Sequence, residues 1–230
     1  MLRQRTSTLR NLELRLLSLF LICDIAVWAV SVNIRDFKFN NGLVVLPGIF
    51  SPSEFMIVQR ISKELCKKSL KKEINSLAKG RFGCRIDRKS ELHEMFSHSR
   101  ILSRIKRATG REKSNLVIPP DFPLEIRKYG IGAHMPFHFD EQLYKHPQLE
   151  LVFTIENTSD SYTCWIDSTG ATQKLRTEPN SLLCIQATTV KHAVTPLKKG
   201  ERVILKGLLV AEGEEILDVN SFEKALQTYS

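Results

Sequence analysis

Residues 182–211 read LLCIQATTVKHAVTPLKKGERVILKGLLVA and contain three apolar-rich runs, at 182–187, 190–194 and 203–211. Turn-forming residues separate these runs, as is typical of short β-strands. Three similar runs precede them, at 124–129, 149–156 and 162–166. A succession of short strands at roughly ten-residue spacing predicts a β-sandwich or barrel.

The part of the chain before Pro119-Pro120 has a different pattern. A strand and turn are predicted over 42–50, and Ser51 and Glu54 then form an S-x-x-E capping box that opens a helix. The apolar residues of this helix fall at helical spacing, at Phe55, Val58, Ile61 and Leu65. A second helix is predicted over about 89–106, with an apolar stripe of Leu92, Met95, Phe96 and Leu102. Helices followed by strands predict a mainly β domain with N-terminal helices.

Length and composition are those of one folded domain. The chain has 230 residues, 42% of them apolar and 26% charged, which is enough for one substantial core. We expect this domain over 36–230, with helical support at 51–115 and a β core at 122–212. The five cysteines are odd in number and form no CxxC pair, which argues against a thiolate zinc site and favours a reducing compartment.

The net charge of +9 is concentrated in one region. Between Arg60 and Lys113 there are 17 Lys and Arg residues against six Asp and Glu. Solvated helix faces are the simpler explanation, and an anionic substrate such as nucleic acid is the alternative.

The N-terminal extension, 1–35, contains several arginines followed by an apolar run at 16–32. This order is typical of a signal peptide or signal anchor, although Asp24 within the run is costly in a bilayer. A helix packed on the domain and a disordered extension are the alternatives. Localisation is therefore either cytoplasmic or membrane-anchored through 16–32. Asn157-Thr158-Ser159 is a glycosylation sequon that would report a lumenal domain.

The segment 129–140, YGIGAHMPFHFD, contains the clearest chemical signal. On a strand, His138 and Asp140 lie on the same face and can supply an imidazole and a carboxylate to one divalent metal. A second histidine would complete the 2-His-1-carboxylate set that binds non-haem iron(II). The HxD pair alone is a weak signal, so its context matters.

That context comes from 190–202, VKHAVTPLKKGER, which we interpret as a strand, a Lys-Lys-Gly turn and a returning strand. If Lys199 is at the turn centre, His192 lies opposite Lys206, and Arg202 and Lys206 share its face; a shift of one residue in the turn would reverse this. A buried arginine needs an anion, and its fork of donors suits a carboxylate.

In these residues the chain resembles the 2-oxoglutarate/iron(II) dioxygenase superfamily, and within it the prolyl 4-hydroxylase-like branch. The matching elements are Tyr129, His138-Phe139-Asp140, His192 and Arg202. The resemblance spans about 42–210 and implies a double-stranded β-helix, the jelly-roll or cupin-like fold. It also implies that the two histidines and Asp140 bind Fe(2+), and that Tyr129 and Arg202 bind 2-oxoglutarate.

By the same resemblance the protein is an oxidoreductase that uses O2 and 2-oxoglutarate, with ascorbate as a candidate reductant, and releases succinate and CO2. The expected reaction is hydroxylation of a peptidyl proline or lysine in a peptide or protein substrate. A nucleic-acid oxygenase or demethylase is the second hypothesis, although 202–206, RVILK, lacks the asparagine of the DNA-repair dealkylases. A binding protein without activity is the third, and the intact triad argues against it.

Four further residues are weaker candidates. His134 and Glu141 flank the motif and are candidates for contact with the substrate, and Trp165 is a candidate for the pocket wall. A structural histidine, a solvated loop carboxylate and a core aromatic are the simpler interpretations. Lys206 is the alternative to Arg202 for the carboxylate contact.

Overall fold

The computed structural model describes residues 39, 42–74 and 77–227. These residues belong to a compact unit that begins at Phe37. The extension 1–35, including the predicted membrane segment 16–32, lies outside the described residues. Within the described part of the chain, no helix is both long and apolar enough to cross a bilayer.

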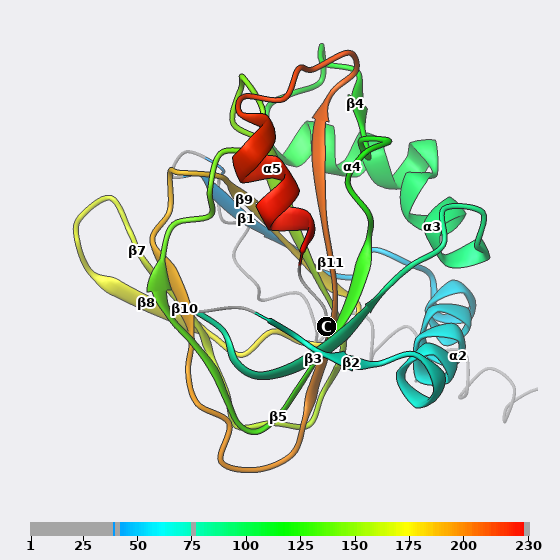
Figure 1. Cartoon of the computed structure of the whole chain (residues 1–230), viewed down its shortest axis with the longest axis vertical. Coiled ribbons are helices and arrows are strands. Elements are labelled where there is room, and N and C mark those ends of the chain that lie inside the picture. The colour runs from blue at the N-terminus through cyan, green and yellow to red at the C-terminus, as the bar shows by residue number, and fades with distance from the viewer. Residues whose placement is uncertain (1–38, 40–41, 75–76, 228–230) are drawn as a thin grey trace, which may run out of the picture. The chain divides into compact units, whose positions relative to one another are not determined.

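A curled antiparallel sheet forms the centre of the unit, with strands in the order β1-β9-β6-β11-β5-β10-β7-β8 (Figure 1). The bounds are β1 (Leu43–Leu46), β5 (Glu125–His138), β6 (Leu149–Asn157), β7 (Thr163–Ile166), β8 (Thr172–Leu175), β9 (Ser181–Gln186), β10 (His192–Val194) and β11 (Arg202–Ala211). Three further strands flank this path: β3 (Lys79–Arg85) pairs with β5, β2 (Lys71–Lys72) pairs with β3, and β4 (Leu116–Val117) pairs with β11. The predicted mainly β, jelly-roll fold class is confirmed.

Strand β5 connects the two halves of the curled sheet. Its first half pairs with β11 and β3, whereas its second half pairs with β10. Gly132, between the halves, has φ +83°, a left-handed conformation that L side chains rarely adopt. One strand therefore contributes side chains to both halves of the sheet.

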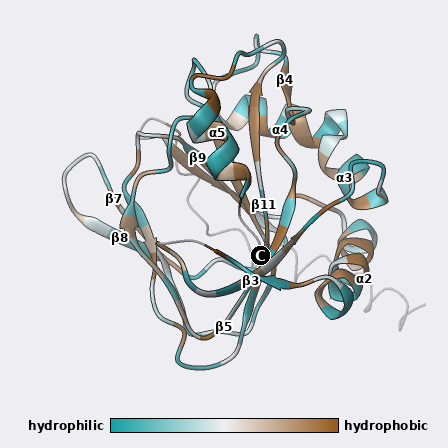
Figure 2. Ribbon diagram, in the orientation of Figure 1, coloured by the Kyte–Doolittle hydropathy of each residue, from teal (hydrophilic) through white to brown (hydrophobic). Residues whose placement is uncertain are grey.

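Three helices cover one side of the larger half of the sheet: α2 (Pro52–Lys68), α3 (Glu91–Ser97) and α4 (Ser99–Ala108). The capping box of Ser51 and Glu54 is confirmed at the start of α2. The predicted apolar faces pack onto Phe153 and its neighbours on β6, β9 and β11, and Figure 2 shows β9 and β11 as largely hydrophobic. Since the helices occupy this side, the opposite, concave side of the strands is left for a site.

Several local predictions were wrong. The segment 89–106 is two helices, because His98 is extended and its ring caps α4. The strand–turn–strand hairpin over 190–206 does not form: β10 pairs with β5 and β7, and His192 lies opposite His138 and Trp165 rather than Lys206. Strands β2 and β3 lie in the region predicted to be helical support, and the C-terminal helix α5 (Val219–Leu226) was not predicted.

The glycosylation sequon lies inside the fold. Asn157 is buried, its Nδ2 donates to the Thr177 carbonyl at 2.9 Å, and its Oδ1 accepts from the Ser159 hydroxyl at 2.7 Å. The folded domain therefore does not present this amide for modification, and a missing glycan would carry no information on localisation.

Candidate metal and cosubstrate site

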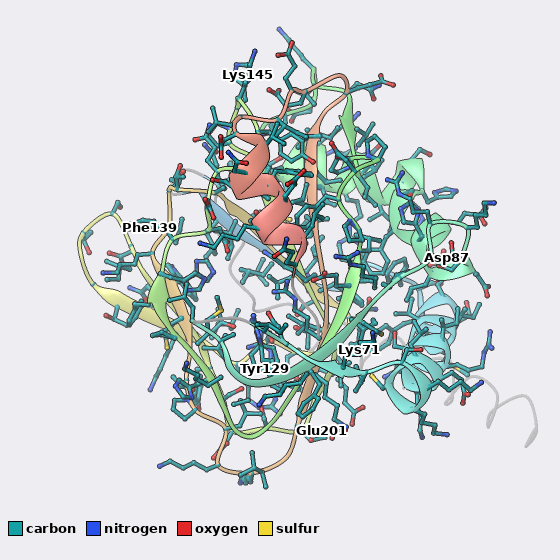
Figure 3. The ribbon with its side chains drawn as sticks, in the orientation of Figure 1. Lys71, Asp87, Tyr129, Phe139, Lys145 and Glu201 are labelled. Atoms are coloured by element: carbon teal, nitrogen blue, oxygen red, sulfur yellow. The ribbon has the colours of Figure 1, made fainter. Side chains whose placement is uncertain are left out.

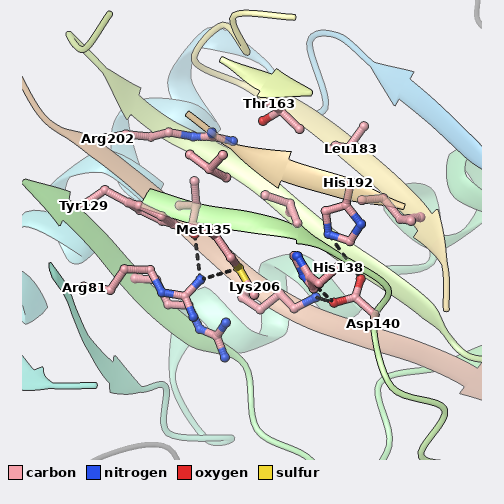
Figure 4. A pocket seen from close by; sticks show the side chains of 15 residues that line it. Arg81, Tyr129, Met135, His138, Asp140, Thr163, Leu183, His192, Arg202 and Lys206 are labelled. Atoms are coloured by element: carbon pink, nitrogen blue, oxygen red, sulfur yellow. Dashed lines mark hydrogen bonds and ion pairs between the residues drawn. The ribbon is translucent and has the colours of Figure 1, made fainter. Parts of the chain in front are cut away.

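A cavity lies on the concave side of the curled sheet (Figure 4). Strands β5, β10 and β11 supply most of its polar residues, β7 adds Thr163, and β6 and β9 supply apolar side chains. The lining residues named below include every predicted metal ligand and both predicted cosubstrate residues. Figure 3 places Tyr129 within the curve of the strands, and Asp87 and Lys145 at the periphery.

The predicted triad forms one cluster. The ligand atoms of His138, Asp140 and His192 all lie within 4.8 Å of one another. His138 Nε2 is 3.7 Å from Asp140 Oδ1, and His192 Nε2 is 3.6 Å from Asp140 Oδ2. His138 ends β5, Asp140 follows it, and His192 begins β10. Adjacent strands therefore bring together residues that are distant in sequence.

Backbone carbonyls orient both imidazoles. His138 Nδ1 lies 2.9 Å from the Pro136 oxygen, and His192 Nδ1 lies 3.1 Å from the Val190 oxygen. Because a carbonyl only accepts, each Nδ1 carries the hydrogen and each Nε2 is left with its lone pair. His138 Nε2 and Asp140 Oδ2 are buried without a hydrogen-bond partner. Two buried acceptors without a donor fit a cation between them.

Charge in the cluster favours the protonation states that bind a metal. Burial alone would raise the pKa of Asp140, but Lys206 and the two histidines lower it overall, so the carboxylate is ionised. Burial lowers the pKa of His192, which keeps its imidazole neutral. Neutral imidazoles and an ionised carboxylate are the forms that coordinate metals.

Arg202 lies at the other end of the cavity (Figure 4). It is 1% exposed, and its Nε and Nη1 have no hydrogen-bond partner. Among the described residues, no carboxylate lies within ion-pair distance of its guanidinium. Tyr129 is directly opposite Arg202 in the β5–β11 register, and the Arg202 Cζ lies 5.9 Å from its ring centroid. A buried unpaired guanidinium is a strong site for an anion.

Lys206, the alternative to Arg202, has other partners. Its ammonium bonds to Glu150 and lies 4.0 Å from Asp140 Oδ1, at the triad end of the cavity. Burial would lower the pKa of Lys206, but Asp140 and Glu150 raise it overall, so the side chain stays charged. Its charge is matched by these two carboxylates, so Lys206 is a weaker anion site than Arg202.

The other three candidates do not line this cavity. His134 is half-buried, and its Nδ1 lies 3.0 Å from the Gly132 oxygen. Glu141 is exposed, and Trp165 is packed into an apolar cluster beside β9. Contact of these residues with substrate stays a prediction.

The sequence did not indicate three polar residues of the cavity, Arg81, Arg127 and Thr163. It also did not indicate two buried glutamates that pair with cations of the cavity, Glu73 with Arg81 and Glu150 with Lys206. Arg81 lies within the basic region that we interpreted as solvated. Nothing in its local spacing distinguishes it from its exposed neighbours, and only the pairing of β3 with β5 brings it inside.

Comparisons with known proteins identify the fold. No family model matches the sequence, and a search of the curated proteins finds no match. Among solved structures, a Pseudomonas putida prolyl-4-hydroxylase aligns with a TM-score of 0.61 at 14% identity, covering 76% of this chain and 95% of that one. A Trichoplax adhaerens prolyl hydroxylase, in complex with a hypoxia inducible factor peptide fragment, aligns with a TM-score of 0.62 at 13% identity, covering 75% and 85%.

A third similar structure is that of an epimerase rather than a hydroxylase. The α-ketoglutarate-dependent non-haem epimerase SnoN, from nogalamycin biosynthesis, aligns with a TM-score of 0.64 at 11% identity, covering 77% of this chain and 81% of that one. At such identities the likeness concerns the fold. The described part of this chain therefore has the fold of the 2-oxoglutarate/iron(II) oxygenases, in the form found in prolyl 4-hydroxylases.

Proposed function

We propose that this protein is a 2-oxoglutarate- and iron(II)-dependent dioxygenase that hydroxylates a C–H bond. One observation carries the proposal: a single cavity combines the His138, Asp140 and His192 cluster at one end with the unpaired guanidinium of Arg202 at the other. A cosubstrate with a chelating group and a distal carboxylate would satisfy both ends.

The residues present fit the iron site. His138, His192 and Asp140 would hold Fe(2+), and three protein ligands leave coordination positions open for a cosubstrate. When bound, iron and 2-oxoglutarate supply the oxidising chemistry: O2 provides one oxygen atom to the product alcohol and one to succinate, and CO2 is released.

The protein's own groups orient the metal ligands and bind the cosubstrate. The carbonyls of Pro136 and Val190 fix the two imidazoles, and Arg202 binds the distal carboxylate with Tyr129 beside it. Apolar side chains shield this contact from water, which strengthens it; they are Val152, Leu183, Ile185, Val194 and Ile204.

For the substrate, we propose a peptidyl proline or lysine. The hydroxylase folds reported above support a peptide, and one of those proteins is seen with a peptide fragment. The basic region gives little support to nucleic acid, because several of its arginines have structural partners. Arg100 pairs with Glu54, Arg104 donates to the Pro47 carbonyl, and Arg81 is buried in an ion pair.

The test is product analysis. Purified protein with Fe(2+), 2-oxoglutarate and O2 should release succinate, and mass spectrometry should find +16 Da, the mass of one oxygen atom, on a proline or lysine of a susceptible peptide. Asp140→Ala is the matched inactive control. Oxidation confined to oligonucleotides would favour the nucleic-acid hypothesis, and equal succinate release by wild type and Asp140→Ala would contradict the function itself.

A further inference from the structure

A buried ion pair lies behind Tyr129, outside the predicted triad and carboxylate contact. Arg81 and Glu73 are 3% and 7% exposed, and their side chains are paired. The backbone N–H of Glu73 also donates to the Arg81 carbonyl at 3.1 Å. Arg81 Nη1 in turn donates to the Tyr129 hydroxyl oxygen at 2.8 Å. Glu73, Arg81 and Tyr129 thus form one connected chain of contacts that ends in the cavity (Figure 4).

The strand register places Tyr129 between two guanidinium groups. Arg81 on β3 and Arg202 on β11 are both directly opposite Tyr129 on β5. Their Cζ atoms lie 5.3 Å and 5.9 Å from its ring centroid. Arg81 has Glu73 as its counter-charge, whereas Arg202 has no carboxylate among the described residues. The two arginines therefore differ in role. Arg202 is available to bind an anion, whereas Arg81 is already paired with Glu73 and hydrogen-bonded to Tyr129.

The bond from Arg81 determines what the phenol can do. A tyrosine hydroxyl has one hydrogen and can also accept. Because Arg81 can only donate, the Tyr129 oxygen accepts, and its own hydrogen is left to donate elsewhere. None of the described residues accepts that hydrogen; the Tyr129 hydroxyl bonds to Arg81 alone among them. The concave side of the sheet, where Arg202 also lies, is where an acceptor would bind.

We propose that Arg81, held by Glu73, is a positioning residue that fixes Tyr129 as a hydrogen-bond donor to the distal carboxylate of 2-oxoglutarate. This inference rests on the proposed function and adds a specificity element to it. The carboxylate would receive a charged partner from Arg202 and a neutral, oriented donor from Tyr129.

Electrostatics agree with this geometry. Burial alone would raise the pKa of the Tyr129 phenol, but Arg81 and Arg202 lower it overall. A more acidic phenol is a stronger donor to a carboxylate. Stability alone gives no reason for the pair, because replacing a buried ion pair by apolar residues is often neutral or stabilising.

A double-mutant cycle on 2-oxoglutarate binding tests the inference without turnover. Titration calorimetry on the protein loaded with Ni(2+) would compare wild type, Tyr129→Phe, the pair variant Glu73→Gln/Arg81→Gln, and all three substitutions together. Changing both members of the pair avoids a lone buried charge. Tyr129→Phe should weaken binding about tenfold, and the pair variant about three- to tenfold. The triple variant should be no weaker than Tyr129→Phe.

The matched control is Lys79→Gln, an exposed change on the same strand, which should leave binding unchanged. Wild-type affinity in the pair variant, or multiplied losses in the triple variant, would overturn the inference, because Arg81 would then not act through Tyr129. Arg81→Lys provides a second route if the pair variant misfolds: it keeps the charge beside Glu73 but loses the donor fork.

A second readout separates this inference from the proposed function. The pKa of Tyr129, obtained from the ultraviolet titration of wild type minus Tyr129→Phe, should rise in the Glu73→Gln/Arg81→Gln variant, which loses the positive charge of Arg81 while Arg202 stays in place. An unchanged phenol pKa overturns the coupling. If wild type bound no 2-oxoglutarate, the proposed function would fail, and the titration would still decide whether Arg81 acts on Tyr129.

Discussion

His138 and His192 lie directly opposite each other on β5 and β10, with ring centroids 4.3 Å apart. The register between these strands shifts, because Val194 lies opposite Met135 rather than Pro136. An extra residue on β5 is a β-bulge, which re-aims the side chains beside it. Pro136 has no N–H for the strand ladder, so its place in the bulge costs no hydrogen bond.

Loss of a metal ligand gives the first prediction, because the cluster of His138, His192 and Asp140 would hold the metal. His192→Ala or Asp140→Ala should weaken Co(2+) binding by more than the roughly 10- to 100-fold typical of losing an outer partner of a metal ligand. Calorimetry or visible absorption of the Co(2+) protein would measure it. His146→Ala removes an exposed histidine, paired with Glu214, as a control. Unchanged binding in both ligand variants would contradict the metal assignment.

The carboxylate contact gives the second prediction. Arg202→Ala removes a charge-assisted hydrogen-bond partner, worth roughly 1.5–3 kcal/mol, so the affinity for 2-oxoglutarate should fall by about one to two orders of magnitude. Arg202→Lys should recover only part of it, because an ammonium lacks the planar fork. Calorimetry on metal-loaded protein provides the measurement. If Lys206→Ala showed this defect and Arg202→Ala did not, the two assignments should be exchanged.

What the sequence could predict depended on local spacing. His138 and Asp140 are only two residues apart, at the end of β5 and just after it. The strand runs at 149–156 and 203–211 are confirmed as β6 and β11. Ser51 and Glu54 satisfy a helix terminus within a single turn, and this local feature was predicted correctly. Features that depend on a few neighbouring residues can therefore be predicted from the sequence alone.

What it could not predict depended on which strands pair. The segment at 198–201 does not join adjacent strands, since β5 lies between β10 and β11. Arg81 and the exposed Lys79 have the same local surroundings in sequence, and only long-range pairing with β5 separates them. When a distant strand buries a charged residue, the neighbouring sequence carries no periodic pattern that signals it. The Glu73–Arg81 pair therefore could not be predicted.

The basic region gives a third prediction. Lys67, Lys68, Lys71 and Lys72 are exposed, and the first two pair with Glu64 on the same helix. Surface pairs of this kind contribute about 0–1 kcal/mol, so changing all four to Gln should hardly affect stability or substrate-coupled succinate release. Rates at about 50 and 200 mM salt should also be similar. A steep loss with salt, removed by the fourfold variant, would instead rank an anionic substrate first.

Alkaline stability should report on Tyr144, which is buried and donates to Asp121 Oδ1 at 2.8 Å. Burial, together with this bond, raises the pKa of the Tyr144 phenol. With the folded pKa above the unfolded value of about 10, the stabilisation is full below that pH and is lost as pH rises beyond it. Urea unfolding at about pH 8 and pH 11 should show that wild type and Tyr144→Phe differ less in free energy of unfolding at the higher pH. A gap independent of pH would rule out this linkage.

Two glycines provide a matched pair that connects stability with the site. Gly170 and Gly200 both have left-handed φ, +82° and +68°. A Cβ at Gly170 would meet nothing within 4 Å, whereas one at Gly200 would lie 2.4 Å from the Thr158 carbonyl oxygen. Gly170→Ala should therefore cost only the conformational strain of about 1–2 kcal/mol. Gly200→Ala adds a backbone overlap and should cost about 1–3 kcal/mol more.

The position of Gly200 extends this effect to the cavity. Hydrogen bonds join the turn before β11 to the loop after β6. The Thr158 N–H donates to the Glu201 carbonyl at 3.0 Å, and the Lys198 N–H donates to Asp160 Oδ1 at 2.9 Å. Arg202 follows this turn directly, so a displaced turn should also weaken 2-oxoglutarate binding in Gly200→Ala but not in Gly170→Ala. Urea unfolding and calorimetry on both variants check the two parts. Equal stability losses would mean that the turn moves freely, and the link between Gly200 and the Arg202 site would then be wrong.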